Sequence, residues 1–168
     1  RGGGEGEAIF KWSRQNGSVA FPVRSLAGNV ATLGACDAGE ILALEPGTWV
    51  EVQDDRDALL RGAGQFARIE AIDTSRRSVT LRPAGGTTAV SFDEDSTTHP
   101  VLRRWDHGQG GGPDGGLIVE EGSWLGLEDG IEVRFEPALT RGARHAYRAG
   151  DYWLIPARTA TGDVEWPM

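Results

Sequence analysis

The chain has 168 residues, of which 39% are hydrophobic and 25% are charged. These proportions are typical of a folded globular protein and exclude a disordered chain. The net charge of −8 argues against a nucleic-acid interface, which should be basic. No run of residues approaches the roughly 18 apolar positions of a membrane-spanning helix. The length suits one ordinary domain, or one domain with a small insert.

The first predicted elements surround Asn16-Gly17, a dipeptide with a strong preference for two-residue hairpin turns. Phe10 and Trp12 lie on either side of Lys11 before it, and Val19, Phe21 and Val23 fall on one face of the stretch after it. We therefore predict a structural β-hairpin across these two stretches. Pro22 lacks an N–H group, so we expect the return strand to lie at a sheet edge or to end there.

Short strands separated by turns follow, and we expect them at residues 48–52, 66–72, 78–82 and 88–92. The acidic residues 54–57 are expected to form a loop between the first two of these strands. Regularly spaced short strands are typical of small barrels. We therefore predict an SH3-like or OB-like β-barrel at residues 38–98, closed by the strand at residues 88–92.

The segment at residues 106–116 reads "DHGQGGGPDGG", and this density of glycine predicts a flexible surface loop. Further strands are expected at residues 117–121, 123–125, 130–135 and 150–156. No segment has a helical period over three turns.

The pattern as a whole predicts an all-β protein. We expect an antiparallel sandwich or barrel built from residues 5–35 and 100–168, with the small barrel inserted between them. The beginning and the end of the chain should then meet in space.

Sites for catalysis or metals are poorly supported. Asp54, Asp55 and Asp57 are weak calcium candidates, because their spacing differs from that of a calcium-binding loop. The histidines have no ligand spacing, so we expect no zinc, and no cofactor motif is present.

Reactive side chains lack the neighbours that catalysis needs. We interpret Lys11, the only lysine, as a solvated or snorkelling strand residue, and Ser13 and Ser18 have no histidine nearby in the sequence. Cys36 is the only cysteine and is read as an idle thiol, with an intermolecular bridge or a reactive thiol as alternatives. We therefore expect a protein that is not an enzyme.

Tryptophan is the richest feature, with six residues. Four tryptophans lie in strand patterns and are expected to fill the core and cover barrel ends: Trp12, Trp49, Trp124 and Trp153. The speculative ligand-binding residues are the tryptophans beside loops, together with their charged neighbours: Trp105, Trp166, Arg103, Arg104 and Asp106.

Five stretches carry a resemblance over residues 8–167: "FKWSRQNGSVAFPV", "GTWVEVQDD", "HPVLRRWDHG", "LEDGIEVRF" and "YRAGDYWLIPARTATGDVEWP". In this order they resemble an uncharacterised domain family of large bacterial multidomain proteins. Some of these proteins are associated with phage-tail-like contractile injection particles or β-helical fibres. The resemblance implies a fragment of a longer polypeptide and supplies no catalytic residues.

Two functions remain open. The first is a non-catalytic structural or assembly module of a tail-like or cell-surface protein, docking to other domains, to particle subunits or to a second copy. The second is a carbohydrate-binding module that places exposed tryptophans on a glycan. The first fits a particle-associated or extracellular location, although the sequence leaves the compartment open.

Overall fold

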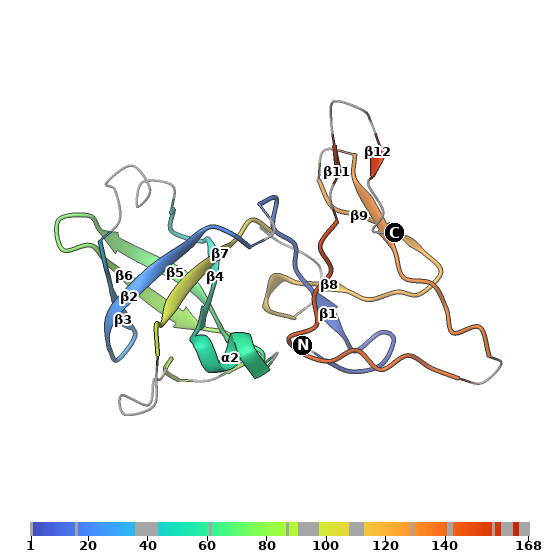
Figure 1. Cartoon of the computed structure of the whole chain (residues 1–168), viewed down its shortest axis with the longest axis horizontal. Coiled ribbons are helices and arrows are strands. Elements are labelled where there is room, and N and C mark those ends of the chain that lie inside the picture. The colour runs from blue at the N-terminus through green and yellow to red at the C-terminus, as the bar shows by residue number, and fades with distance from the viewer. Residues whose placement is uncertain are drawn as a thin grey trace.

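The computed structural model contains a closed β-barrel and a more open β-rich part beside it (Figure 1). We call the open part the flanking part and define it as residues 2–12 and 113–155. The structure describes residues 2–15, 17–35, 44–60, 62–86, 88–90, 98–107, 113–128, 130–140, 143–155, 157–158 and 163–164. The all-β antiparallel class predicted from the sequence is confirmed.

Six antiparallel strands form the barrel in the closed order β2-β3-β6-β5-β4-β7. Their bounds are β2 (Ala20–Ala27), β3 (Val30–Leu33), β4 (Trp49–Gln53), β5 (Gln65–Asp73), β6 (Ser78–Pro83) and β7 (Val101–Trp105). The expected insert at residues 38–98 supplies β4, β5 and β6, and the segments on either side of it supply the other three strands.

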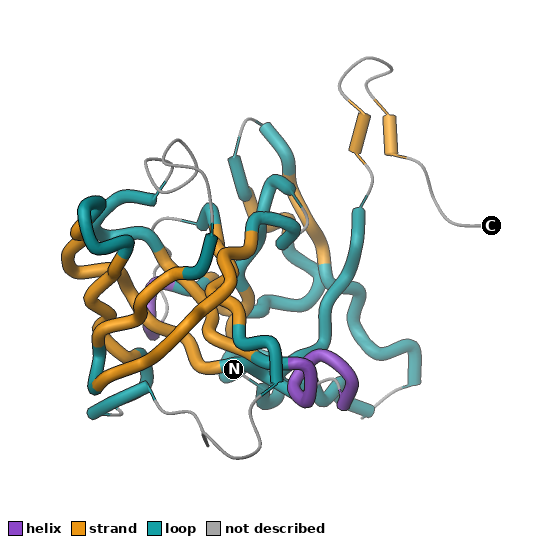
Figure 2. Tube along the Cα trace, turned by 60° about the vertical axis from the view of Figure 1, so that its left-hand side comes forward, coloured by secondary structure: helices purple, strands orange, loops and turns teal. Residues whose placement is uncertain are grey.

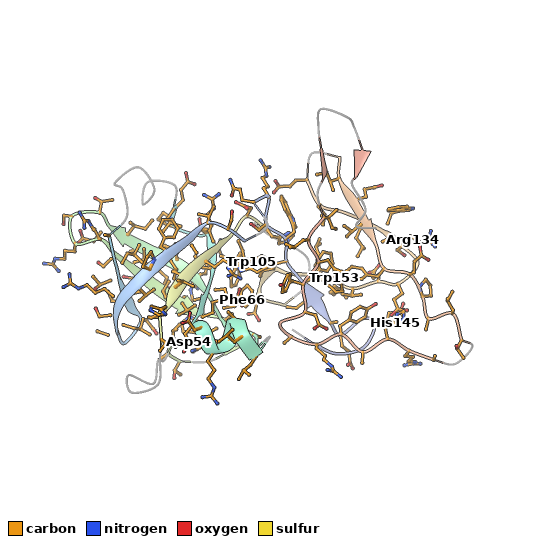
Figure 3. All side chains as sticks on the ribbon, viewed as in Figure 1. Asp54, Phe66, Trp105, Arg134, His145 and Trp153 are labelled. Carbon is orange, nitrogen blue, oxygen red and sulfur yellow. The ribbon has the colours of Figure 1, made fainter. Side chains whose placement is uncertain are left out.

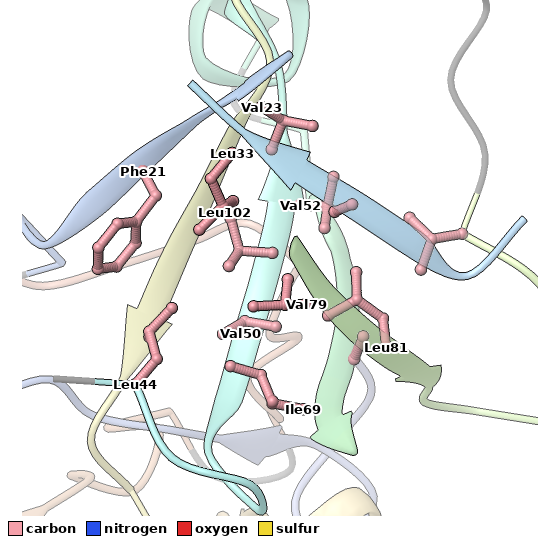
Figure 4. Packing of buried hydrophobic residues seen from close by; sticks show 13 residues of the cluster. Phe21, Val23, Leu33, Leu44, Val50, Val52, Ile69, Val79, Leu81 and Leu102 are labelled. Atoms are coloured by element: carbon pink, nitrogen blue, oxygen red, sulfur yellow. The ribbon is translucent and has the colours of Figure 1, made fainter. Parts of the chain in front are cut away.

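The core lies inside the barrel, where alternate residues of every strand point (Figure 4). Val50, Val79 and Leu102 are fully enclosed, and the other main members are Phe21, Val23, Leu33, Leu44, Val52, Ile69, Leu81 and Val90. Burial of each large aliphatic side chain stabilises the fold by about 1.5–3 kcal/mol. Phe21 and Val23 therefore point inward together, as the alternation around them predicts.

The strands outside the barrel are short and form two-stranded sheets (Figure 2). The pairs are β1 (Ile9–Phe10) with β8 (Leu117–Ile118), β9 (Trp124–Gly126) with β10 (Glu132–Arg134), and β11 (Ala157–Arg158) with β12 (Asp163–Val164). A 3₁₀ turn, η1 (Pro113–Gly115), precedes β8. The beginning of the chain meets its later part, since Gly3 forms a bridge with Tyr147. Residues 151–155 form no strand, although one was predicted at residues 150–156.

The predicted first hairpin is wrong. A turn is present, with Ser18 N donating to Gln15 O at 3.0 Å and Gly17 at φ 67°. Its two arms belong to different sheets, because β1 pairs with β8 whereas β2 pairs with β3 and β7. A turn signal specifies a local reversal, but the choice of strand partner depends on distant segments. Asn16 itself lies outside the described residues.

The edge position expected from Pro22 is also wrong, because β2 continues to Ala27 within a closed barrel. Pro22 lies where the partner strand changes. Pairing with β7 covers Ala20 to Pro22, and pairing with β3 begins at Val23. A residue without an N–H is tolerated at such a junction, since an irregularity in the ladder follows directly.

The barrel closes through β7, which pairs with both β2 and β4. We predicted that a strand at residues 88–92 closes the barrel. That prediction is wrong for residues 88–90, which form no strand. Residues 91–92 lie outside the described part.

No helix among the described residues is long and apolar enough to cross a membrane.

The acidic stretch expected as a loop begins a helix, α2 (Asp55–Leu60). The Asp54 carboxylate accepts from the backbone N–H groups of Arg56 at 2.9 Å and Asp57 at 3.1 Å. The Asp57 carboxylate accepts in return from Asp54 N at 3.4 Å. This reciprocal arrangement is a capping box, which satisfies backbone donors at a helix start.

Candidate functional site

Trp105 lies half-buried at the end of β7. Its ring centroid lies 5.7 Å from that of Phe66 on β5 (Figure 3). The indole Nε1 donates a hydrogen bond to Glu51 Oε2 at 3.2 Å. Because both the ring and the N–H group already have protein partners, these contacts favour a structural role in the barrel wall.

Glu51 is a buried carboxylate, with 7% of its surface exposed. Its second oxygen, Oε1, accepts from Gly64 N at 2.9 Å. Burial raises the pKa of Glu51, while the two hydrogen bonds and the charge of Arg103 oppose that effect. A Cβ atom at position 64 would lie 2.6 Å from Glu51 Cγ, so this close approach requires glycine.

Arg104 and Asp106 form a second polar cluster. Arg104 Nη2 lies 3.2 Å from Asp106 Oδ1, and both side chains are largely buried. Asp106 Oδ2 also accepts from Ser13 Oγ at 3.1 Å and from Arg14 N at 2.9 Å. Ser13 and Arg14 belong to the segment between β1 and β2. Their hydrogen bonds to Asp106 therefore hold this segment against the end of β7.

The candidate ligand-binding residues do not share one surface. Side chains alternate along a strand, so Arg103 and Trp105 point to one side of β7 and Arg104 to the other. Trp105 and Arg103 lie near Glu51 in the barrel wall. Arg104 instead pairs with Asp106, beside the segment that connects β1 and β2. Trp166 lies outside the described residues, as do Cys36 and residues 108–112 of the glycine-rich loop.

Lys11 occupies a site that the sequence interpretation missed. Its Nζ atom lies 4.1 Å from the centroid of the Trp49 ring and donates to the backbone oxygen of Asp114 at 2.8 Å. Burial lowers the pKa of Lys11 to about 8, with the charge of Asp114 opposing and that of Arg68 assisting. Lys11 follows β1 and lies in no strand, and its ammonium group has partners from distant parts of the chain, which the sequence did not indicate.

His107 is buried beside Trp12, with ring centroids 6.2 Å apart. Burial, followed by the charge of Lys11, lowers the pKa of His107, which favours a neutral imidazole. His107 Nε2 and Trp12 Nε1 have no hydrogen-bond partner within the described part of the chain. Trp12 ends the first segment of the flanking part, and His107 follows the barrel strand β7, so their contact lies where the two parts meet.

Aromatic side chains hold the flanking part together. The Phe135 ring lies 5.2 Å from Phe10, 5.7 Å from Tyr147 and 5.7 Å from Trp153. Tyr147 Oη donates to Glu121 Oε1 at 2.9 Å, and His145 Nδ1 lies 3.2 Å from the same oxygen. Burial, together with this hydrogen bond, raises the pKa of Tyr147 to about 12.

The flanking part has a small interior and a large apolar surface. Among its described residues, the buried apolar side chains are Ala8 and Val119. Its exposed large apolar side chains are Trp124, Ile131, Leu139, Tyr152, Trp153, Leu154 and Ile155. The expectation that Trp124 and Trp153 fill the interior is therefore wrong for both.

The two exposed tryptophans point in different directions. Arg134 pairs with Trp124 across β9 and β10, and its guanidinium lies 6.0 Å from the Trp124 ring. The next residue, Phe135, packs against Trp153. Because neighbouring side chains alternate, Trp124 and Trp153 lie on opposite sides of this ribbon.

The calcium candidates have other partners. Asp54 and Asp57 cap α2, and Asp55 Oδ2 lies 2.7 Å from His99 Nδ1. Within the described ranges, no group of three or more histidine, cysteine, aspartate or glutamate residues is arranged to hold a metal ion.

Comparison with known proteins places the whole sequence in one family. No curated protein and no solved structure matches the chain. A family model described as a family of unknown function, DUF6519, matches residues 2–168. Because this match spans nearly the full length, the chain belongs to the DUF6519 family.

Proposed function

We propose that this chain is a non-catalytic structural or assembly module of a larger bacterial protein of the tail-like or cell-surface type. The observation that carries the proposal is the flanking part, whose described residues bury little apolar surface and include seven exposed large apolar side chains. Two-stranded sheets are marginally stable unless something packs on them. A neighbouring domain or particle subunit would supply that cover, which fits a particle-associated or extracellular location.

The polar groups of the described residues support the same function. Glu51, Asp106 and Lys11 each bind groups from other segments of the chain. Their hydrogen bonds stabilise the barrel wall, the connecting segment and the flanking part, and the contact of Lys11 with the Trp49 ring joins the flanking part to the barrel. Contacts of this kind hold separate segments of the chain in fixed positions, which is what a structural module requires.

Hydrogen–deuterium exchange of the chain alone and of its longer parent polypeptide tests the proposal. Backbone amides at residues 124–134 and 147–155 should exchange at least about tenfold more slowly in the longer polypeptide or its assembly. Amides of β4 and β7 serve as the internal control, because the barrel core already protects them. Equal exchange at residues 124–134 and 147–155 in both samples would contradict an assembly role.

Carbohydrate binding is the alternative, and Trp124 is the observation that favours it. This side chain is 63% exposed and lies beside Arg134, which is the arrangement of a small stacking site. A glycan array followed by a tryptophan fluorescence titration tests it. Saturable binding that Trp124→Ala abolishes and Trp105→Phe preserves would establish the alternative.

A further inference from the structure

Two enclosed hydrogen-bond donors on the outer wall of the barrel have no partner within the described part of the chain. They are Gln53 Nε2, at the end of β4, and Arg103 Nε, in the middle of β7. Gln53 is 6% exposed, and Arg103 is half-buried. An enclosed donor without an acceptor is costly, so native proteins supply an acceptor for nearly all such atoms.

The two donors lie on the same side of neighbouring strands. In the antiparallel pair of β4 and β7, Glu51 is opposite Arg103 and Gln53 is opposite Val101. Residues that face each other in such a pair point to the same side of the sheet, and so do residues two apart along one strand. Gln53 and Arg103 are therefore diagonal neighbours on the outer side, a separation that long side chains can span.

The buried carboxylate of Glu51 adjoins both donors. Glu51 lies two residues before Gln53 on β4 and directly opposite Arg103 on β7. Its oxygens accept from Gly64 N and Trp105 Nε1, and each oxygen has a second lone pair for a further hydrogen bond. Burial raises the pKa of Glu51 and the charge of Arg103 opposes this effect, so the two charges are close enough to interact. Arg103 Nε nevertheless does not bond to the carboxylate directly.

The combination of two donors and one acceptor selects the ligand. An anion would be repelled by the carboxylate of Glu51, and a metal cation would face two N–H groups and the charge of Arg103. A water molecule fits both kinds of group, because it can accept two hydrogen bonds and donate two. Buried waters typically make about three hydrogen bonds to polar groups that have no other partner. Gln53, Arg103 and Glu51 supply three such groups.

We propose that a buried water molecule on the outer wall of the barrel bridges Gln53, Arg103 and Glu51. The water accepts from Gln53 Nε2 and Arg103 Nε and donates to the carboxylate of Glu51. It thereby links β4 through side chains to β7, the strand that closes the barrel. This water site belongs to the barrel and does not depend on the proposed assembly function.

Water-selective NOE and ROE spectra of the isotope-labelled chain test the site directly. The side-chain amide protons of Gln53 and the Nε proton of Arg103 should show cross-peaks to water. Opposite signs in the two kinds of spectrum indicate a bound water, and equal signs indicate exchange of these protons with the solvent. Missing cross-peaks, or equal signs for Gln53, would overturn the inference.

A double-mutant cycle tests whether the two donors share one ligand. Gln53→Met and Arg103→Met each remove a donor and keep an apolar stem, so each should raise the equilibrium constant of unfolding about tenfold. The double variant should raise it by clearly less than the product of the single effects, because the water is lost only once. Single effects that multiply fully would overturn the inference.

Phe66 provides the matched control for this cycle. It lies on β5 opposite Glu51 and is therefore diagonal to Gln53, as Arg103 is on β7. Phe66→Leu removes no hydrogen-bonding group, so its effect should multiply with that of Gln53→Met. Equal coupling in the two cycles would contradict a shared water, because packing alone would then account for it.

A phosphate titration distinguishes water from an anion at this site. Inorganic phosphate at millimolar concentrations should leave the side-chain resonances of Gln53 and Arg103 unchanged, because Glu51 repels an anion. A saturable shift of these resonances would identify an anion as the ligand and would overturn the inference.

Discussion

The Nζ atom of Lys11 lies 4.1 Å from the centre of the Trp49 ring, and this contact joins the flanking part to the barrel. Lys11 directly follows β1, and Trp49 is the first residue of β4. The same ammonium group donates to the backbone of Asp114 in the turn before β8. Three segments that are distant in the sequence therefore meet at the only lysine of the chain.

The first prediction concerns the pH dependence of stability. The pKa of Lys11 is lowered from 10.5 to about 8, so between these values the unfolded chain holds a proton that the folded chain has released. Stability therefore rises as the pH increases from about 8 to 10.5, by about 1 kcal/mol after allowance for partial exposure. Urea unfolding at several pH values measures this rise.

Lys11→Met is the matched variant for this prediction. It keeps the apolar stem over Trp49 and removes the titrating group, so the difference from the parent chain isolates Lys11 from other groups. A difference in stability that does not change between pH 8 and 10.5 would contradict the assigned pKa.

The second prediction concerns Tyr147. Tyr147→Phe removes the hydrogen bond to Glu121 and should destabilise the protein by about 1 kcal/mol. The pKa of Tyr147 is raised to about 12, so the stability it contributes is complete below pH 10 and disappears as the pH rises through 12. Thermal unfolding of the parent chain and of Tyr147→Phe, at a pH below 10 and at a pH near 12, measures this loss of stability. Tyr152→Phe, at an exposed position, is the control and should have no effect.

The third prediction assigns Trp105 to stability. Trp105→Ala leaves the Oε2 atom of Glu51 without a donor and removes the ring from Phe66, so we expect a loss of about 2–3 kcal/mol. Trp105→Phe keeps the ring contact and should cost about 1 kcal/mol. Chemical denaturation of both variants provides the measurement, and equal stability of Trp105→Ala and the parent chain would refute the barrel-wall role.

The fourth prediction concerns the acidic cluster at α2. Asp54→Ala removes the acceptor for two backbone N–H groups and should destabilise the protein by about 1 kcal/mol. Asp54→Ser retains a capping oxygen and should recover most of that loss. Millimolar calcium should leave the melting temperature of the parent chain unchanged, and a clear increase would instead support a calcium site.

The strands of the barrel were largely predictable from sequence, whereas their partners were not. The alternation at residues 66–72 and 78–82 marks β5 and β6, because one face of each strand must be apolar to enter the core. The same signal around Asn16-Gly17 led to a wrong hairpin. Alternation and turn residues are local, while β1 and β8 pair across more than half of the chain.

The candidate site was less predictable than the fold. Trp105 and Arg104 are neighbours in the sequence, but they point to opposite sides of β7 and enter different clusters. In β4 both faces are buried, because Trp49 and Glu51 on its outer side are covered by segments from elsewhere. No pattern within the strand itself could have indicated that cover.

The sequence by itself determined that this protein is built from short antiparallel strands, since side-chain alternation and glycine turns follow from backbone geometry alone. Tertiary structure decided which strands close the barrel and which apolar residues remain uncovered. Those outcomes depend on contacts between distant segments, where burial and hydrogen bonding compete over the whole chain. Tyr152 to Ile155 have the composition of a core strand, and only the fold leaves them at the surface.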